Sequence, residues 1–553
     1  MKKEQNRASD TSLARRLDWF ITLIPFLCIV ILCIWFVRNP EQSSQLLASI
    51  RSLLGDQMGS YYLLIGLGVF FCSLYMAFSR FGNIRLGDLE KPEYTFFQWG
   101  SMMFTAGLAA DILFYSCCEW ILYANEPHIE EMGGIQEWAS TYPLFHWGPI
   151  PWSFYLVLAV AFGFMLHVRK RTKQKFSESC RPILGKRVDG WSGKIIDFIA
   201  VIALLAGTAT TFSLATPLLS MAISRVTGIP QSVALTIFIL ISICCIYTFC
   251  VYLGMKGVQL AASCCVYLFF MLLAYVFFLG GEIRYIIETG LSSIGNLVQN
   301  FIGLSTWTDA LRTSSFPQNW TIFYWSYWIV WCVATPFFIG SISRGRTVRQ
   351  VVLGGYSFGL AGTFTSFIIL GNYGMGLQMH GRLDLLSVYT KTGDLYAAIV
   401  SVLEQLPLPG LVLILLVLCM VTFYSTSFDS ITLVAAAYSY KELKPNEEPN
   451  RNIKLFWSIM LILLPIALIF SENSMANLQT VSIIAAFPLG IVRITEQGTV
   501  TEYDKDISPY DYTVYTSIMC GESLRFYWTT YQNQQIQCVD MNHLKKGMKA
   551  VQF

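Results

Sequence analysis

The sequence predicts an all-α polytopic membrane protein with twelve transmembrane helices, and three observations support this class. Of the 553 residues, 54% are hydrophobic and only 13% are charged, a balance outside the range of soluble domains. The charged residues gather between long apolar runs rather than within them. Lys and Arg are also concentrated in every second loop, as expected when successive loops lie on opposite sides of a membrane, and this asymmetry agrees with twelve spans.

Each expected helix is an apolar run of about 18 residues or more, the length that crosses a bilayer. Eleven such runs are long enough to span, and a twelfth begins near residue 477. Residues 291–313 are amphipathic but too polar to span, so we expect them to lie along the surface. The earlier runs lie near residues 18–38, 59–79, 96–122, 144–168, 192–224, 231–254, 260–288, 318–342, 350–372, 396–436 and 453–471.

The distribution of positive charge predicts the orientation, because cytoplasmic loops carry an excess of Lys and Arg. The N-terminus, residues 169–194 and the loop with Arg344, Arg346 and Arg349 hold many of these residues. We therefore expect a multi-pass protein of the cytoplasmic (cell) membrane with a cytoplasmic N-terminus. The net charge of +3 follows from this topology, and nothing in the sequence predicts binding to nucleic acid.

The stretch Phe316–Gln350 stands out for its density of aromatic residues. On a helix, Tyr324, Trp328 and Trp331 share one face, and Tyr327 lies beside them. Electron-rich rings that converge inside a membrane suit a quaternary ammonium, a cation without N–H groups. The alternative is an interfacial belt, where Trp and Tyr are common. Twelve residues of this stretch contain Trp320, Phe323, Tyr324, Trp325, Tyr327, Trp328 and Trp331.

The run Asn319–Trp328 resembles the signature W-T-x-x-Y-W-x-W-W of the betaine/choline/carnitine transporter (BCCT) family. One position departs from it, since Tyr327 stands where the family usually has Trp. The resemblance extends from about residue 15 to Val492, with Ser343–Thr347 and His146–Trp152 in register.

This resemblance implies a fold and a function. The fold would be LeuT-like, with two extra helices before two inverted five-helix repeats at about 96–288 and 318–492. The function would be secondary active transport of quaternary (trimethyl)ammonium compounds such as choline, carnitine or betaine, by alternating access across the lipid bilayer. Family members are often trimers, so the resemblance leaves a homotrimer as one possible assembly. The chain would divide into a cytoplasmic N-terminus (1–17), a transporter core (18–492) and a tail (493–553).

Two carboxyl groups lie in the apolar run 96–122, where an ionisable side chain is costly and therefore a functional candidate. We expect Asp111 to be functional, whereas Glu119, nearer the outer end, could equally be interfacial or cap a neighbouring helix. In the family, sodium-coupled betaine carriers have glycine at the position of Asp111, and proton-coupled choline carriers have aspartate. The resemblance thus favours a cationic substrate, a coupling proton, or both.

The resemblance also implies an aromatic box for the ammonium group, formed by Trp147, Trp152, Tyr155 and Trp328. We count Tyr327, Trp331 and Asp111 as further substrate-binding candidates, and expect the Tyr327 hydroxyl to donate to a substrate oxygen. His146 is interpreted as a structural hydrogen-bonding residue.

The coupling ion is left open between Na⁺ and H⁺, and no cofactor is expected. The resemblance maps Thr426 and Ser427 onto sodium-coordinating hydroxyls, with Thr105 and Leu108 offering backbone carbonyls. The alternative is that these hydroxyls only link helices. In sodium-independent exchangers of the family an arginine replaces the ion. The matching position here is Cys265, which argues against ion-free exchange.

Residues 493–553 form an atypical polar tail rich in Tyr, for which we expect a few short strands. Either a reading-frame change near Val492 or a lineage-specific cytoplasmic domain would explain it. The sequence contains no metal-ligand cluster, nucleophile motif or phosphate loop, so an enzyme is not predicted. The alternative function is a non-transporting sensor of the same ligands that signals through this tail.

Overall fold

The computed structural model describes residues 15–106, 110–171, 173–253, 255–443, 447–470, 479–490, 516–520, 523–530 and 533–540. The chain is helical from Trp19 to Gly490 in these ranges, and strands occur only in the described part of the tail. The first helices are α2 (Trp19–Arg38), α3 (Pro40–Arg51), α4 (Gly59–Phe78), α5 (Phe96–Thr105), α6 (Ala110–Ala124), α7 (Pro127–Met132), α8 (Ile135–His146), α9 (Pro149–Gly163), α10 (Phe176–Ser179), α11 (Arg181–Leu184) and α12 (Trp191–Thr227).

The second half of the chain continues the same architecture. Short π-helical turns lie at Ser52–Gln57, Phe164–Val168, Pro317–Thr321 and Phe367–Gly371, and 3₁₀ turns at Arg80–Asn83 and Gly185–Asp189. The remaining helices are α13 (Val233–Leu253), α14 (Met255–Leu279), α15 (Ile283–Thr306), α16 (Ile322–Trp331), α17 (Thr335–Ile342), α18 (Val348–Ser366), α19 (Asn372–Met379), α20 (Leu385–Thr392), α21 (Leu395–Glu404), α22 (Pro409–Tyr438), α23 (Arg451–Phe470) and a last one at Gln479–Gly490.

Seven helices among the described residues are long and apolar enough to cross a membrane, or up to nine if each bent pair counts as one span. The count of twelve stays a prediction. The single span expected at 396–436 is wrong, because α21 and α22 are separate helices. Pro407 and Pro409 flank Leu408, which has φ 51°, and proline both removes an N–H donor and disfavours helical geometry in the residue before it.

The surface helix begins earlier than expected. α14 ends at Leu279, and α15 starts at Ile283 after a bend of 111°. Gly281 in the bend has φ 77°, a conformation that glycine adopts without strain. Residues 291–306 of the expected amphipathic segment therefore form the second part of a longer helix, and residues 307–313 lie beyond its end.

Two helices are broken near the middle of the molecule. The helix expected at 96–122 divides into α5 and α6, on either side of residues 107–109, which lie outside the described residues. The helix expected at 318–342 bends by 54° between Trp331 and Thr335. Pro336 is at the start of α17, where it prevents a continuous hydrogen-bond ladder. These breaks bring helix ends into the interior.

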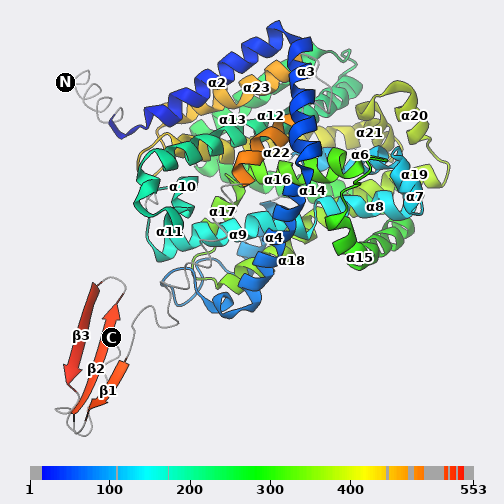
Figure 1. The fold of residues 1–553 in the computed structure, drawn as a ribbon. Coiled ribbons are helices and arrows are strands. Elements are labelled where there is room, and N and C mark those ends of the chain that lie inside the picture. The colour runs from blue at the N-terminus through cyan, green and yellow to red at the C-terminus, as the bar shows by residue number, and fades with distance from the viewer. Residues whose placement is uncertain are drawn as a thin grey trace, which may run out of the picture.

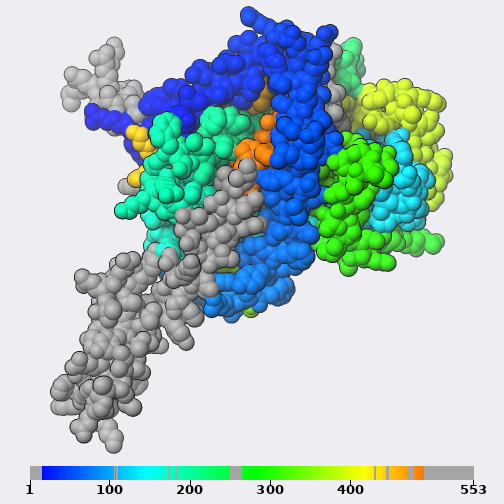
Figure 2. Space-filling view, viewed as in Figure 1, coloured from blue at the N-terminus to red at the C-terminus, as the bar shows by residue number. Residues whose placement is uncertain are grey.

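The N-terminal helices lie at the periphery of the helical body. Figure 1 shows α2 across one end and α3 and α4 following one another down the face turned to the viewer, and Figure 2 shows the same segments as a band over that surface. Deeper in the molecule, α17 packs on α9 through two glycines. A Cβ atom at Gly340 would lie 2.7 Å from the Ala159 carbonyl oxygen and 2.8 Å from the Gly163 nitrogen. Only glycine permits this approach of the two helices.

The tail contains an antiparallel three-stranded sheet in the order β1 (Thr516–Cys520), β2 (Ser523–Thr530) and β3 (Asn533–Asp540). In its register Ser517 is opposite Phe526, and Tyr527 is opposite Cys538. The prediction of a few short strands in the tail is confirmed. The all-α class therefore holds for the described residues before the tail.

Candidate functional site

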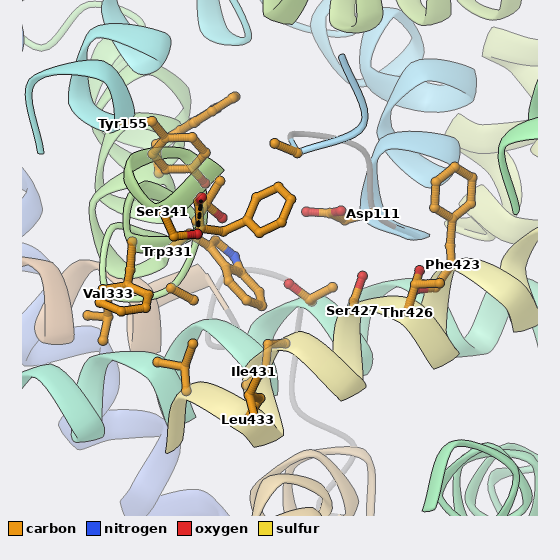
Figure 3. Close-up of a pocket in the computed structure, with 18 of the residues that line it drawn as sticks. Asp111, Tyr155, Trp331, Val333, Ser341, Phe423, Thr426, Ser427, Ile431 and Leu433 are labelled. Atoms are coloured by element: carbon orange, nitrogen blue, oxygen red, sulfur yellow. Dashed lines mark hydrogen bonds between the residues drawn. The ribbon is translucent and has the colours of Figure 1, made fainter. Parts of the chain in front are cut away.

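A cavity of about 500 Å³ lies where the two broken helices meet. Its wall is formed by α6, α9, α12, α14, α16, α17 and α22, so residues from both halves of the chain contribute. The side chains of predicted function that line it are Asp111, Trp147, Tyr155, Tyr327, Trp328, Trp331, Thr426 and Ser427. Figure 3 shows the Asp111 side chain directed into this space, with Ser427 and Thr426 projecting from α22.

Asp111 is held at the N-terminal end of α6. Its Oδ2 accepts a hydrogen bond of 2.5 Å from the Tyr327 hydroxyl, and its Oδ1 accepts one of 3.1 Å from the backbone N–H of Ile112. Tyr327 Oη is also hydrogen-bonded to Thr211 on α12. A helix N-terminus favours a negative charge, as do both donors. In this structure the Tyr327 hydroxyl donates to Asp111 Oδ2. Its expected donation to a substrate oxygen stays a prediction.

Three aromatic rings surround Trp328. The ring centroid of Tyr155 is 4.7 Å from that of Trp328, and those of Trp147 and Trp152 are each 5.6 Å away. Trp147, Tyr155 and Trp328 line the cavity, whereas Trp152 is packed behind Trp328 against Gly359. The four predicted members of the box therefore converge, but only three of them border the open space.

The indole nitrogens of two rings add polar character to this aromatic wall. Trp328 Nε1 and Trp331 Nε1 are buried and have no hydrogen-bond partner among the described residues. Both side chains line the cavity. An unpaired buried N–H costs free energy, so a ligand oxygen or a water molecule at these atoms would be stabilised.

The predicted ion ligands are only partly accounted for. Thr426 and Ser427 line the cavity, and Thr426 Oγ1 donates to the carbonyl oxygens of Thr422 and Phe423, each at 3.0 Å. Leu108 and the side chain of Thr105 lie outside the described residues. Whether these positions coordinate an ion stays a prediction.

The model of the BCCT, betaine/carnitine/choline family transporters matches residues 20–501 of this chain. The chain belongs to the BCCT family. Membership in this family identifies it as a multi-pass membrane transporter. The uncharacterized transporter YeaV of Escherichia coli (strain K12) is 28% identical over 428 residues, which cover 77% of this chain and 89% of the relative.

A second model overlaps the end of this BCCT match. The model of linear amide C–N hydrolases of the choloylglycine hydrolase family matches residues 473–549, a range that contains the three-stranded sheet. It covers a small part of the chain and leaves the membership in a transporter family unchanged.

The cavity of this BCCT protein extends towards one end of the helices. Its lining there includes Gln174, Lys175, Ser341 and Tyr438. Lys175 is buried and pairs with two carboxylates, with Nζ 3.0 Å from Asp18 Oδ2 and 3.9 Å from Asp197 Oδ2. Sequence reasoning missed Lys175. A lysine in a basic loop carries no signal that it faces a cavity.

Packed aromatic rings close the opposite end of the BCCT cavity. His146 stacks on Tyr324 at 5.0 Å between centroids, and Tyr123 contacts Trp320 edge to face at 5.3 Å. Glu119 lies beneath these rings without exposed surface. Whether it lies at the depth of the membrane interface stays a prediction. Its partners are the hydroxyl of Tyr123 and the indole N–H of Trp147.

Two titratable groups lie outside the spans at this closed end. Burial raises the pKa of Glu126, although the indole N–H of Trp320, 2.7 Å from Glu126 Oε1, opposes the shift. Burial lowers the pKa of His128, against the attraction of Glu131 and Asp309. The His128 ring is stacked on Trp307 with centroids 3.9 Å apart. The closed end of this BCCT protein therefore disfavours charge on both groups.

Proposed function

We propose that the protein carries trimethylammonium compounds across the cytoplasmic membrane, with a preference for choline-like ligands that have no carboxylate of their own. The observation that carries the proposal is the Asp111 carboxylate beside the rings of Trp147, Tyr155 and Trp328 in one cavity. A cationic ligand in this space would meet aromatic faces for its methyl groups and a counter-charge for its nitrogen.

The rings supply a plausible affinity. Each desolvated cation–π contact contributes about 0.5–2 kcal/mol, and three rings of the predicted aromatic box border the cavity. Micromolar binding corresponds to about 8 kcal/mol, so the rings account for part of the free energy and the charge of Asp111 for a further part. The N–H groups of Trp328 and Trp331 would bind the oxygen at the other end of the ligand.

The shape of the cavity fits alternating access. In the predicted orientation, residues 169–194 are cytoplasmic, so an opening at Gln174 and Lys175 would make this the inward-facing state. The two broken helices that border the cavity would be the first helices of two inverted repeats, at about 96–288 and 318–492, as in LeuT-like carriers.

Uptake of labelled ligand into proteoliposomes tests the proposal. The wild type should accumulate choline, and Asp111→Asn should lose choline uptake far more than carnitine uptake, because carnitine balances its own charge. Asp189→Asn removes a carboxylate outside the cavity and serves as the control. Binding without accumulation would instead support the sensor. Equal losses for both ligands would overturn the role of Asp111 as counter-charge.

The coupling ion is tested in the same vesicles. We propose that a proton and the ligand cation compete for Asp111, so that choline binding weakens as the pH falls. Because competing cations are exchanged, accumulation should then follow a proton gradient directed out of the vesicle and not a sodium gradient. Dependence on Na⁺ alone would move the coupling site to Thr426 and Ser427.

A further inference from the structure

A line of buried polar groups runs from the aromatic wall of the cavity towards its closed end. Trp147 Nε1 donates to Glu119 Oε2 at 2.8 Å, and the Tyr123 hydroxyl donates to Glu119 Oε1. Tyr123 Oη lies 2.6 Å from His146 Nδ1, and His146 Nε2 lies 2.9 Å from Thr321 Oγ1. Each of these side chains is at most 3% exposed.

When Glu119 is a carboxylate and His146 is neutral, the cluster carries one negative charge without a counter-charge. The titratable groups that face Glu119 are Tyr115, Cys118 and Tyr123 on its own helix, His146 on α8 and Tyr324 on α16. Among the described residues, His146 is the basic group recorded within ion-pair distance, with Nδ1 3.6 Å from Glu119 Oε1. Burying a lone negative charge costs several kcal/mol, and one added proton makes the cluster neutral.

The hydrogen bonds allow that proton to be shared. With a carboxylate at Glu119, Tyr123 donates to it, His146 Nδ1–H donates to Tyr123 Oη, and Nε2 accepts from Thr321. A proton that arrives at Nε2 first makes an imidazolium. The Nδ1 proton can then pass to Tyr123 as the Tyr123 proton passes to Glu119. The product is a neutral carboxyl group and a neutral imidazole protonated at Nε2, with no other bond changed.

We propose that Glu119, Tyr123 and His146 form one proton-binding site, loaded from the Thr321 end, that adjusts the position of Trp147. The indole N–H of Trp147 donates to a carboxylate in the unloaded state and to a neutral carboxyl group in the loaded state. A charge-assisted hydrogen bond is about twice as strong as a neutral one, so loading loosens Trp147 at the wall of the cavity. The site requires no substrate for its occupancy and is separate from Asp111.

Infrared difference spectra between pH values test this site on the full-length protein in lipid nanodiscs without ligand. Lowering the pH should produce the C=O stretching band of a buried protonated carboxyl group. The band should vanish in Glu119→Gln and persist in Asp111→Asn, which removes the carboxyl group lining the cavity. The assay needs no transport, so failure of the proposed function would leave this result unaffected.

Two further variants keep the test decisive if Glu119→Gln does not fold. Tyr123→Phe removes one donor to the carboxyl group and should move the band to a frequency typical of weaker hydrogen bonding. Trp147→Phe should shift the pH midpoint of the band upwards by about one unit, because the carboxylate loses a charge-assisted hydrogen bond. A band that is unchanged in both variants, or no pH-dependent band in the wild type, would overturn the proposal.

Discussion

The Tyr327 hydroxyl lies 2.5 Å from Asp111 Oδ2, although the two residues are 216 positions apart in the chain. Tyr327 is the position at which the aromatic signature departs from its usual Trp, and an indole could not place a hydroxyl at this point. The carboxylate and the phenol therefore form one unit in the cavity. Substituting one of them changes the environment of the other.

We expect Tyr327→Phe and Asp111→Asn to be non-additive in their effects on choline affinity. Tyr327→Phe removes the donor, and Asp111→Asn leaves an amide oxygen that can accept only a neutral hydrogen bond. Each single variant therefore already loses the charge-assisted bond, and the double variant should lose less than the sum of the two single losses. The coupling energy should be about 1–3 kcal/mol, as for a hydrogen bond to a charged group. Calorimetric titration of the wild type and the three variants measures it, and additive losses would show that the two residues act independently.

Trp328 should bind the ligand through its ring rather than fill space. Trp328→Leu keeps an apolar side chain and should weaken choline binding by about tenfold or more. Trp328→Phe retains an aromatic face, so its choline affinity should lie between those of the wild type and Trp328→Leu. Choline affinity and melting temperature are measured together, so that a loss of folding is recognised. Wild-type affinity in the leucine variant would contradict a cation–π role.

His128 should make the closed end sensitive to acid. Its pKa is lowered in the folded protein by burial, so its contribution to stability is complete above the unfolded pKa of about 6.5 and is lost as the pH falls below it. The apparent melting temperature should drop between about pH 7.5 and about pH 5.5. His128→Gln can still pair with Tyr142, and its drop should be smaller. An equal drop in both proteins would place the acid sensitivity elsewhere.

The contact between α9 and α17 should tolerate no side chain at Gly340. A methyl group there would lie within 2.8 Å of backbone atoms, so Gly340→Ala should destabilise the protein by about 1–3 kcal/mol. Gly303 in α15 has no atom within 4 Å of the corresponding position, and Gly303→Ala should leave the stability unchanged or raise it slightly. Thermal unfolding of the two alanine variants compares them, and similar midpoints would argue against a close helix contact.

Much of the site was predictable because its residue types are unusual in an apolar chain. Asp111 was identified from the cost of a carboxyl group in a span, Trp328 from the aromatic signature, and Trp147 and Trp152 from the aromatic box that the family resemblance implies. The resemblance did not reveal that Trp152 is packed behind Trp328. Which ring borders a cavity depends on how helices from distant parts of the chain pack.

Proline positions in the sequence indicate where some helices end, whereas contacts between helices leave no such local signal. Pro407 and Pro409 mark the end of α21 in the sequence, yet the apolar character of 396–436 suggested one long span. The partners of Tyr327 and Glu119 were not predictable, since they lie on other helices or depend on the exact rotation of one helix. Hydropathy records how apolar a segment is and contains no information on such pairs.

The size of the cavity bears on how long a ligand would stay. At about 500 Å³ it has room for a small trimethylammonium compound together with several water molecules. We expect the part of the ligand near Gln174 and Ser341 to remain hydrated, so its departure requires little rehydration and has a low barrier. Residence times in this conformation should accordingly be short, which favours turnover over storage.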